Sequence, residues 1–386
     1  MELAQRATIL TPSLTLSIDS KAKAMKAEGI DVCGFGAGEP DFDTPDHIKA
    51  AAQAAIETGF TKYTPSSGTP ELRQALADKF KADNGLDYKP SQIIVSNGAK
   101  HSCYNAILAT IQQGDEVIIP APYWLSYPEM VRLAGGEPVF VQTKEENGWK
   151  MTAEEFQDAM TPRTKLVIIN SPGNPTGAVY TAEELQAIVD VAADEEILIL
   201  SDEIYEKLVY DDAKHVSTAT LPGAFDITIT VNGFSKAYAM TGWRLGYLAA
   251  PEPIAKAIDA IQSHSTSNPC SFAQKGAVAA LKGDQQPVTD MREEFDLRRN
   301  YMINRLKAIP KLSLVEPKGA FYILANISQL GLSSTNFADR LLSKHHVAVV
   351  PGVAFGNDNT VRLSYATSLD IIKKGLDRFE EFCKTL

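Results

Sequence analysis

Four short stretches place polar side chains at the ends of apolar runs. The first, Ser171–Gly177 (Ser-Pro-Gly-Asn-Pro-Thr-Gly), directly follows the apolar run Lys165–Asn170. Its two prolines and two glycines predict a rigid loop, and open α/β sheets bind ligands at the carboxyl ends of their strands. Asn174 would offer such a ligand an amide donor. A plain turn that favours asparagine explains the same residues.

An acid stands at the end of the next apolar run. Asp202 and Tyr205 follow the run Ile197–Leu200. A carboxylate at the edge of a buried strand is desolvated and needs a partner, which the protonated ring nitrogen of a cofactor would supply. The alternative is an aspartate that caps the start of a helix.

A lysine follows the run Ile227–Val231, among glycines and aromatic residues. If Lys236 is kept dry, it becomes a usable amine nucleophile. Ser235 and Arg244 would suit a phosphate, since a guanidinium matches a dianion and a hydroxyl adds a neutral donor. The competing interpretation is a surface lysine beside an ion-paired arginine.

The fourth stretch is Val361–Tyr365. Alternation along a strand puts Val361, Leu363 and Tyr365 on one face and Arg362 with Ser364 on the other. An arginine in a short apolar strand either forms a buried ion pair or binds the carboxylate of a ligand.

The apolar runs also predict the sheet that positions these residues. They lack the polar alternation of half-exposed strands and therefore predict strands buried on both faces. Helical stretches lie between them, with start signals at Thr69 and Thr181 and a stop signal at Gly85. This alternation predicts an α/β fold with a mostly parallel sheet and helices on both faces. The predicted strands are Ile93–Ser96, Glu116–Pro120, Lys165–Asn170, Ile197–Ser201 and Ile227–Val231.

The last hundred residues predict a smaller α+β domain. A charged helix over Gln286–Ala308 precedes a final helix that starts near Ser368, with three strands between them: Phe321–Asn326, Val347–Val350 and Val361–Tyr365. The segment up to about Gly34 has no sheet-core run, so we expect it to pack on this domain or on a partner subunit. The predicted division is 1–45, an N-terminal arm with part of the small domain, then 46–285 and 286–386.

Composition excludes several classes of function. With 386 residues, 44% hydrophobic and 22% charged, the chain has the composition of a globular protein of two domains. Its net charge of −11 argues against a nucleic-acid surface, and Arg298-Arg299 are expected on a solvated helix face. No apolar stretch approaches the roughly 18 residues of a membrane span, and no secretory signal precedes the first motif.

The cysteines and histidines predict no metal site and a reducing, cytoplasmic environment. The four cysteines are scattered without a Cys-x-x-Cys pair, and the six histidines have no His-x-x-x-His spacing. We therefore expect neither disulfides nor a metal ion.

In order and local sequence, these residues resemble the class I aminotransferases of pyridoxal-phosphate fold type I, especially the bacterial-type aspartate aminotransferase subgroup Iβ. The resemblance extends from about Pro12 to the C-terminus. It implies a large domain with a mostly parallel seven-stranded sheet between helices, plus a smaller α+β domain. The residues that carry the resemblance are Asn174, Asp202, Tyr205, Lys236, Arg244 and Arg362, with the segments 37–42, 62–63, 121–124, 174–177 and 242–246.

The resemblance implies that Lys236 holds pyridoxal 5′-phosphate as an internal Schiff base and then moves the proton between substrate and cofactor. Asp202 would keep the pyridine nitrogen protonated, which makes the ring an electron sink. Tyr205 and Asn174 would hydrogen-bond the 3′ oxygen of the cofactor. Trp124 would stack on the ring, although on its own it is as easily a core or interface tryptophan.

For the phosphate, the resemblance implies the helix start at Gly98, Ala99 and Lys100, together with Ser235 and Arg244. Ala99 and Lys100 stand where other branches have a hydroxyl residue, and close relatives can carry alanine in place of Ser235. The phosphate-binding site would then depend more on backbone amides. Tyr63 would come from the second subunit of a homodimer, although a turn tyrosine explains it as well.

Substrates implied by the resemblance are amino acids and 2-oxo acids, in a ping-pong reaction. Arg362 would bind the α-carboxylate with Gly38 and Asn174. Lys100 would favour a second carboxylate, hence aspartate and glutamate. Lys100 with Thr15 also resembles subgroup members that convert prephenate to arogenate; a polar residue that opens a helix is the alternative for Thr15.

Two kinds of alternative share these motifs. The same fold and cofactor serve alanine and aromatic aminotransferases, C–S lyases and cyclopropane-forming synthases, because a fold does not determine the reaction. A catalytically silent, pyridoxal-phosphate-binding sensor module is the non-enzymatic alternative. It is disfavoured because the set of Lys236, Asp202, Tyr205 and Arg362 is intact and no basic helix-turn-helix precedes it.

Overall fold

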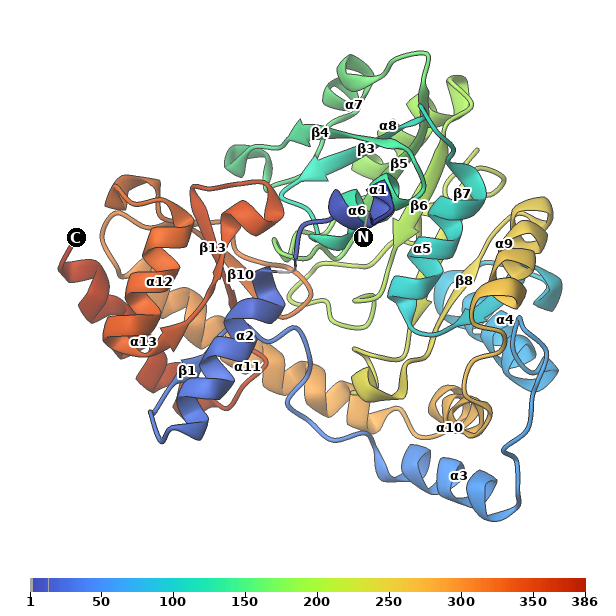
Figure 1. Cartoon of the computed structure of the whole chain (residues 1–386), viewed down its shortest axis with the longest axis horizontal. Coiled ribbons are helices and arrows are strands. Elements are labelled where there is room, and N and C mark those ends of the chain that lie inside the picture. Colours follow the sequence, from blue (N-terminus) through green and yellow to red (C-terminus); the bar gives the residue numbers. More distant parts are fainter. Residues whose placement is uncertain (1–2, 13) are drawn as a thin grey trace.

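The computed structural model describes residues 3–12 and 14–386; Met1, Glu2 and Ser13 of the predicted N-terminal arm lie outside the described residues. Its largest sheet has seven strands, and each neighbouring pair is parallel except the two pairs that involve β8. The predicted seven-stranded, mostly parallel sheet is confirmed (Figure 1). In spatial order the strands are β2 (Ile93–Ser96), β8 (Gly246–Ala249), β7 (Thr228–Gly233), β6 (Leu198–Asp202), β5 (Thr164–Asn170), β3 (Glu116–Ala121) and β4 (Glu137–Gln142).

Apolar runs predicted five of these strands and missed two. β4 is an edge strand that contains Pro138 and several exposed residues, so it lacks the continuous apolar run of a central strand. β8 is buried but only four residues long and begins at Gly246. A glycine at the start of a short strand gives little local signal.

Helices cover both faces of the sheet. Along β5, Leu166 and Ile168 pack in one core cluster, and Val167 and Ile169 pack in another on the opposite face. The helices around the sheet are α3 (Asp46–Glu57), α4 (Pro70–Asn84), α5 (Ala99–Thr110), α6 (Ser126–Leu133), α7 (Ala153–Ala159), α8 (Ala182–Asp194), α9 (Glu252–Ser265) and α10 (Ser271–Lys282).

The predicted helix signals are confirmed. Thr69 accepts a hydrogen bond from the Leu72 amide at 3.3 Å, and Gly85 ends α4 in the left-handed conformation. Thr181 and Glu184 form the capping box at the start of α8.

The C-terminal part forms a second, antiparallel sheet in the order β12-β13-β10-β9. The expected single strand Val347–Val350 is two short strands, because β11 pairs with β1 and β12 pairs with β13. The elements are α11 (Gln286–Lys307), β9 (Ser313–Leu314), β10 (Tyr322–Asn326), α12 (Ser334–His345), β11 (Val347–Ala348), β12 (Val350–Pro351), β13 (Thr360–Ser364) and α13 (Leu369–Lys384).

From Leu14 onward, the N-terminal segment packs on this C-terminal part of its own chain, whereas the Thr11 amide donates to Glu129 of α6 at 3.3 Å (Figure 1). β1 (Cys33–Gly34) pairs in parallel with β11, and Ala22 of α2 (Leu14–Ala27) joins a small core cluster with Leu342 and Ala348. The short α1 (Gln5–Thr8) precedes α2. Short 3-10 helices are η1 (Pro90–Gln92), η2 (Glu145–Asn147), η3 (Thr218–Thr220), η4 (Thr241–Trp243), η5 (Ser328–Leu330) and η6 (Gly352–Phe355).

No helix within residues 3–12 and 14–386 is both long and apolar enough to cross a membrane.

The expectation that Arg298 and Arg299 lie on a solvated helix face is wrong. Arg299 is 1% exposed: its guanidinium bonds Asp211 at 2.7 and 3.0 Å, Asp296 at 2.8 Å and the Pro317 carbonyl at 2.8 Å. Arg298 is also buried and bonds Asp41 at 2.7 Å. Each arginine pairs with one acid on α11 and with one acid distant in sequence, and the local pattern along α11 shows only the first, so it could not reveal their burial.

We expect Arg299→Met to lower the free energy of unfolding by about 2–3 kcal/mol, because two carboxylates and a buried carbonyl lose their donor. Urea denaturation followed by circular dichroism measures the change. The matched control is Lys256→Met, whose partner Glu252 lies at 3.2 Å on an exposed helix face. Its cost should stay below about 0.5 kcal/mol. Equal losses in the two variants would contradict a structural role for Arg299.

Candidate active site

A cavity of about 490 Å³ lies where the carboxyl ends of the large-sheet strands face the C-terminal sheet and α2. Segments far apart in sequence contribute to its wall, as expected for a site at this edge of an α/β sheet. The predicted site residues that line it are Thr15, Gly38, Ala99, Lys100, Trp124, Asn174, Asp202, Tyr205, Ser235, Lys236, Arg244 and Arg362.

Asp202 ends β6 and is 4% exposed. Its carboxylate accepts hydrogen bonds from the Tyr127 hydroxyl at 2.7 Å, the Ile204 amide at 3.2 Å and the Cys103 thiol at 3.8 Å. A turn, not a helix, follows it, so the helix-cap alternative is wrong. Burial raises the pKa of Asp202, because its donors are neutral groups. A cationic ligand group beside it would relieve this cost.

Lys236 follows β7 and points into the same cavity. Its Nζ donates to the Gly38 carbonyl and lies 5.9 Å from the centre of the Tyr205 ring and 5.7 Å from that of Phe321. Burial lowers the pKa of Lys236 to about 8. The surface-lysine alternative is therefore wrong, and roughly a tenth of this amine is neutral at pH 7, against far less than a hundredth for an exposed lysine.

Arg362 is 2% exposed in the middle of β13. It donates to Asn174 Oδ1 at 2.9 Å and to the Gly36 carbonyl at 2.8 Å, and its Nε has no hydrogen-bond partner. Among residues 3–12 and 14–386 it has no salt bridge to a carboxylate. The buried ion-pair alternative is wrong. A guanidinium held by neutral oxygens suits a carboxylate ligand.

The start of α5 and Arg244 form an anion-binding corner. Gly98 precedes the helix with φ 90°, and a Cβ atom there would collide with the Arg244 guanidinium. Within the described part of the chain, Arg244 donates only to carbonyls, those of Thr241 at 3.0 Å and Asn97 at 3.4 Å. Ser235 is buried and lines the cavity nearby. Helix amides, a hydroxyl and a guanidinium are the donors that a phosphate prefers.

Two further residues give the cavity its polar rim. The Lys100 ammonium lies 4.9 Å from the centre of the Trp124 ring, and burial lowers its pKa, with the Arg244 charge adding to the effect. The Thr15 hydroxyl, on α2, is buried without a hydrogen-bond partner. Both groups are therefore available to a ligand inside the cavity.

Two of the predicted residues do not line the cavity of their own chain. Gly98 lies behind it, against Arg244. Tyr63 is 91% exposed and belongs to none of the cavity-lining segments.

Sequence reasoning missed several residues of the wall, among them Asn170, Tyr127 and Tyr322, and one buried residue that bonds Asp202, Cys103. Tyr127 and Cys103 bond Asp202, Asn170 donates to the Asp202 carbonyl at 2.9 Å, and Tyr322 lies beside Arg362. Tyr127 lies in the first turn of α6, three residues after Trp124, which precedes the helix, and the two rings meet edge to face with centroids 5.1 Å apart. The other three had no local signal, because tertiary contacts bring them to the site.

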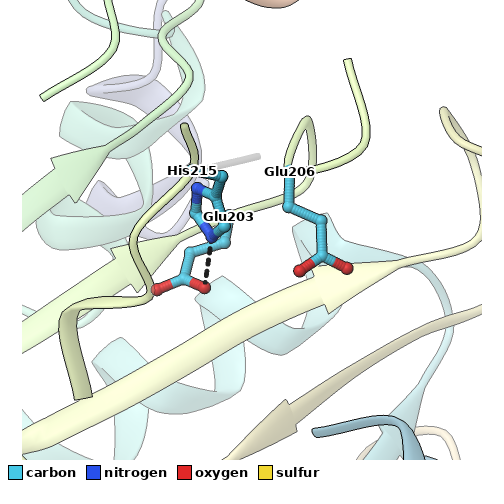
Figure 2. A group of neighbouring side chains, drawn as sticks. All are labelled: Glu203, Glu206 and His215. Carbon is cyan, nitrogen blue, oxygen red and sulfur yellow. Dashed lines mark hydrogen bonds and ion pairs between the residues drawn. The ribbon is translucent and has the colours of Figure 1, made fainter. Parts of the chain in front are cut away.

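Behind Asp202, the structure groups Glu203, Glu206 and His215 with ligand atoms within 4.8 Å of one another (Figure 2). Glu203 accepts from His215 at 3.0 Å; its other donors are Ser201 at 2.8 Å, Ser217 at 3.0 Å and the Thr218 amide at 3.1 Å. Three side chains of these types, this close together, could hold a metal ion. The sequence predicts no metal site and does not single out these residues.

Protein donors satisfy these carboxylates. Glu206 forms an ion pair with Lys79 and accepts from Asn84 at 2.9 Å. Burial opposes ionisation of Glu206, but the charges of Lys79 and His215 outweigh it and lower its pKa to about 2. With a lysine already in place, we assign the group to the polar framework that holds the backbone around Asp202.

Comparisons with known proteins agree with this geometry. Residues 30–379 match the family model for class I and II aminotransferases. The chain is 51% identical to an aspartate aminotransferase of Bacillus subtilis (strain 168), over 99% of both chains, and 48% identical to an aspartate/prephenate aminotransferase of Cereibacter sphaeroides, over 97% of both. An aspartate aminotransferase from Thermus thermophilus, solved with maleate, superposes with a TM-score of 0.96 at 44% identity over 99% of both chains. The chain belongs to the class I and II aminotransferase family.

Proposed function

We propose that this protein is a pyridoxal 5′-phosphate-dependent aminotransferase that exchanges the amino group between aspartate or glutamate and 2-oxo acids by a ping-pong mechanism. One observation carries the proposal. A buried carboxylate without a cation, a lysine with a pKa of about 8 and a buried guanidinium without a carboxylate all face one cavity. Bound ligands with complementary charge would satisfy each group.

The residues fit pyridoxal phosphate. Asp202 would hold the pyridinium nitrogen, Tyr205 and Asn174 the 3′ oxygen, and Trp124 one ring face. The corner at Gly98, Ala99, Ser235 and Arg244 would hold the phosphate. When bound, the cofactor supplies an electron sink for the negative charge that develops on the α-carbon of the substrate.

The chain itself supplies binding and proton transfer. Arg362 orients the α-carboxylate of the amino acid, supported by Asn174 and the Gly38 backbone. The Lys236 Nζ, once it is free, would accept the proton from the α-carbon and donate it to the C4′ carbon of the cofactor. The aromatic rings around Lys236 limit access of water to that amine.

Lys100 supports a preference for dicarboxylates. It lines the same cavity as Arg362 and has no salt bridge to a carboxylate within residues 3–12 and 14–386. A second carboxylate on the substrate would pair with it. The Bacillus subtilis relative is named for aspartate, and maleate, with which the Thermus thermophilus enzyme was solved, is itself a dicarboxylate.

The proposal extends to the assembly and the location. The exposed Tyr63 would complete the phosphate site of a second copy in a homodimer. The arm 1–45 and the region 286–386 would form a small domain that carries Arg362, and 46–285 a large domain that carries Lys236. The described cysteines are all free, which agrees with a reducing cytoplasm.

Lys236→Ala should fold normally but lose the link to the cofactor that borohydride reduction makes permanent. In the wild-type protein, the rate of cofactor uptake should rise with pH and level off above about pH 8, because only the neutral amine reacts and its pKa is lowered to about 8. Stopped-flow absorbance measures this profile. A profile that keeps rising toward pH 10.5 would mean that the amine is not desolvated.

Lys100→Ala should lower kcat/KM for aspartate and glutamate by about a hundredfold and for alanine by less than about threefold, because only the dicarboxylates lose an ion pair. A panel of amino donors and 2-oxo acids measures both. Lys23→Ala is the matched control, since Lys23 also lines the cavity but already pairs with Asp19 at 2.7 Å. Equal losses for all substrates would remove Lys100 from substrate selection.

Amination of prephenate is a second candidate activity. Thr15 and Lys100 both line the cavity, and the Cereibacter sphaeroides relative is named for this substrate. With glutamate as donor, the enzyme should form arogenate, and Thr15→Val should reduce this rate about tenfold while it changes aspartate turnover less than about twofold. Chromatographic detection of arogenate is the measurement. No arogenate from the active wild-type enzyme would exclude this activity.

A further inference from the structure

Tyr322 lies at the start of β10, on the wall of the cavity that faces β6, and is 1% exposed. In the antiparallel pairing, Tyr322 is opposite Ser364 and Leu324 is opposite Arg362. Tyr322 and Arg362 are therefore diagonal neighbours on one face of the C-terminal sheet. The Arg362 guanidinium lies 4.3 Å from the centre of the Tyr322 ring.

The hydroxyl of the same residue reaches the large-sheet side of the cavity. Tyr322 Oη lies 2.9 Å from Tyr205 Oη, and the two rings meet edge to face. Gly38 also lies close to it, because a Cβ atom there would be 3.4 Å from the Tyr322 hydroxyl. One side chain thus contacts three parts of the wall.

The two hydroxyls share one hydrogen bond, and either atom is able to donate it. Each hydroxyl has a single proton. If Tyr205 gives its proton to the 3′ oxygen of the cofactor, the proton between the two tyrosines has to come from Tyr322. A hydroxyl that accepts a hydrogen bond becomes a stronger donor.

We propose that Tyr322 is a positioning residue with two separable roles: its hydroxyl orients and strengthens the Tyr205 donor, and its ring supports the Arg362 guanidinium. This inference rests on the proposed function. It makes Tyr322, like Asn174, a residue that physically connects the cofactor side and the carboxylate side of the cavity.

The charged and titratable groups around the tyrosine pair come from three places. Arg362 lies on β13, Asp202 ends β6, and the Lys236 Nζ is 5.9 Å from the centre of the Tyr205 ring. Replacement of Tyr322 by phenylalanine leaves all three in the protein. A change in the titration of the bound cofactor in this variant would then result from the loss of the Tyr322 hydroxyl.

Tyr322→Phe keeps the ring and removes only the hydroxyl. The absorbance of the bound cofactor changes with pH as the nitrogen that joins it to Lys236 loses its proton. In the cofactor-loaded variant, we expect the pH at the midpoint of this change to rise by about half a unit. A weaker Tyr205 donor leaves more negative charge on the 3′ oxygen, which retains the proton on the nitrogen that joins Lys236 to the cofactor. We expect kcat for aspartate to fall about fivefold and KM to stay within about twofold of wild type.

Tyr322→Leu removes the ring as well. We expect the same shift of the midpoint, together with a rise of about tenfold in KM for both aspartate and glutamate, because the Arg362 guanidinium loses the nearer of its two aromatic neighbours and keeps only Phe355, at 5.1 Å. A KM unchanged in Tyr322→Leu would overturn the role of the ring.

Tyr365→Phe is the matched control. Tyr365 is buried in the same part of the chain and its hydroxyl donates to the Ala320 carbonyl at 3.1 Å, but it does not line the cavity. Thermal unfolding of the cofactor-free variants should show similar losses for the two phenylalanine substitutions, whereas only Tyr322→Phe should move the midpoint. A midpoint unchanged in Tyr322→Phe, or moved equally by Tyr365→Phe, would overturn the role of the hydroxyl. If the wild-type protein showed no cofactor absorbance at all, the proposed function would fail instead.

Discussion

The site depends on buried charges that the chain itself does not neutralise. Asp202 has only neutral donors, and Arg362 has only neutral acceptors. Each isolated charge in a protein interior costs stability, so such groups persist where a ligand of opposite charge compensates them. By contrast Arg299, equally buried, is fully paired by carboxylates and has no donor left for a ligand. Arg362 and Arg299 are therefore distinguished by the presence or absence of carboxylate partners, and not by their exposed fractions.

The two unneutralised charges stand on opposite walls because the chain builds the cavity from two sheets. The large parallel sheet contributes Asp202 and Lys236 at its carboxyl edge, where successive strands end side by side. The antiparallel C-terminal sheet contributes Arg362 and Tyr322. Short hydrogen bonds cross between the walls, from Arg362 to Asn174 and between Tyr205 and Tyr322. The geometry of the cavity therefore depends on how the two sheets are positioned against each other.

Much of this could be predicted from the sequence, because the central strands are continuous apolar runs and the helix caps are local. The positions of Asp202 and Lys236 follow from where those runs end. What could not be predicted depends on contacts between distant segments. Edge strand β4, the buried partners of Arg299 and the position of Tyr322 have no local pattern. For Asp202 and Arg362, local reasoning left two interpretations open, and only the identity of their neighbours decided between them.

The parallel pairing of β1 with β11 has a consequence for the order of assembly. Cys33 and Gly34 acquire their strand partner only after about three hundred further residues have been synthesised, and the Gly36 carbonyl meets Arg362 later still. The strands that carry Asp202 and Lys236, by contrast, have all emerged by residue 249. On the ribosome, the lysine half of the cavity is therefore able to fold while α2 and β1 still lack their C-terminal partners. These two early elements are among the last parts of the chain to become native.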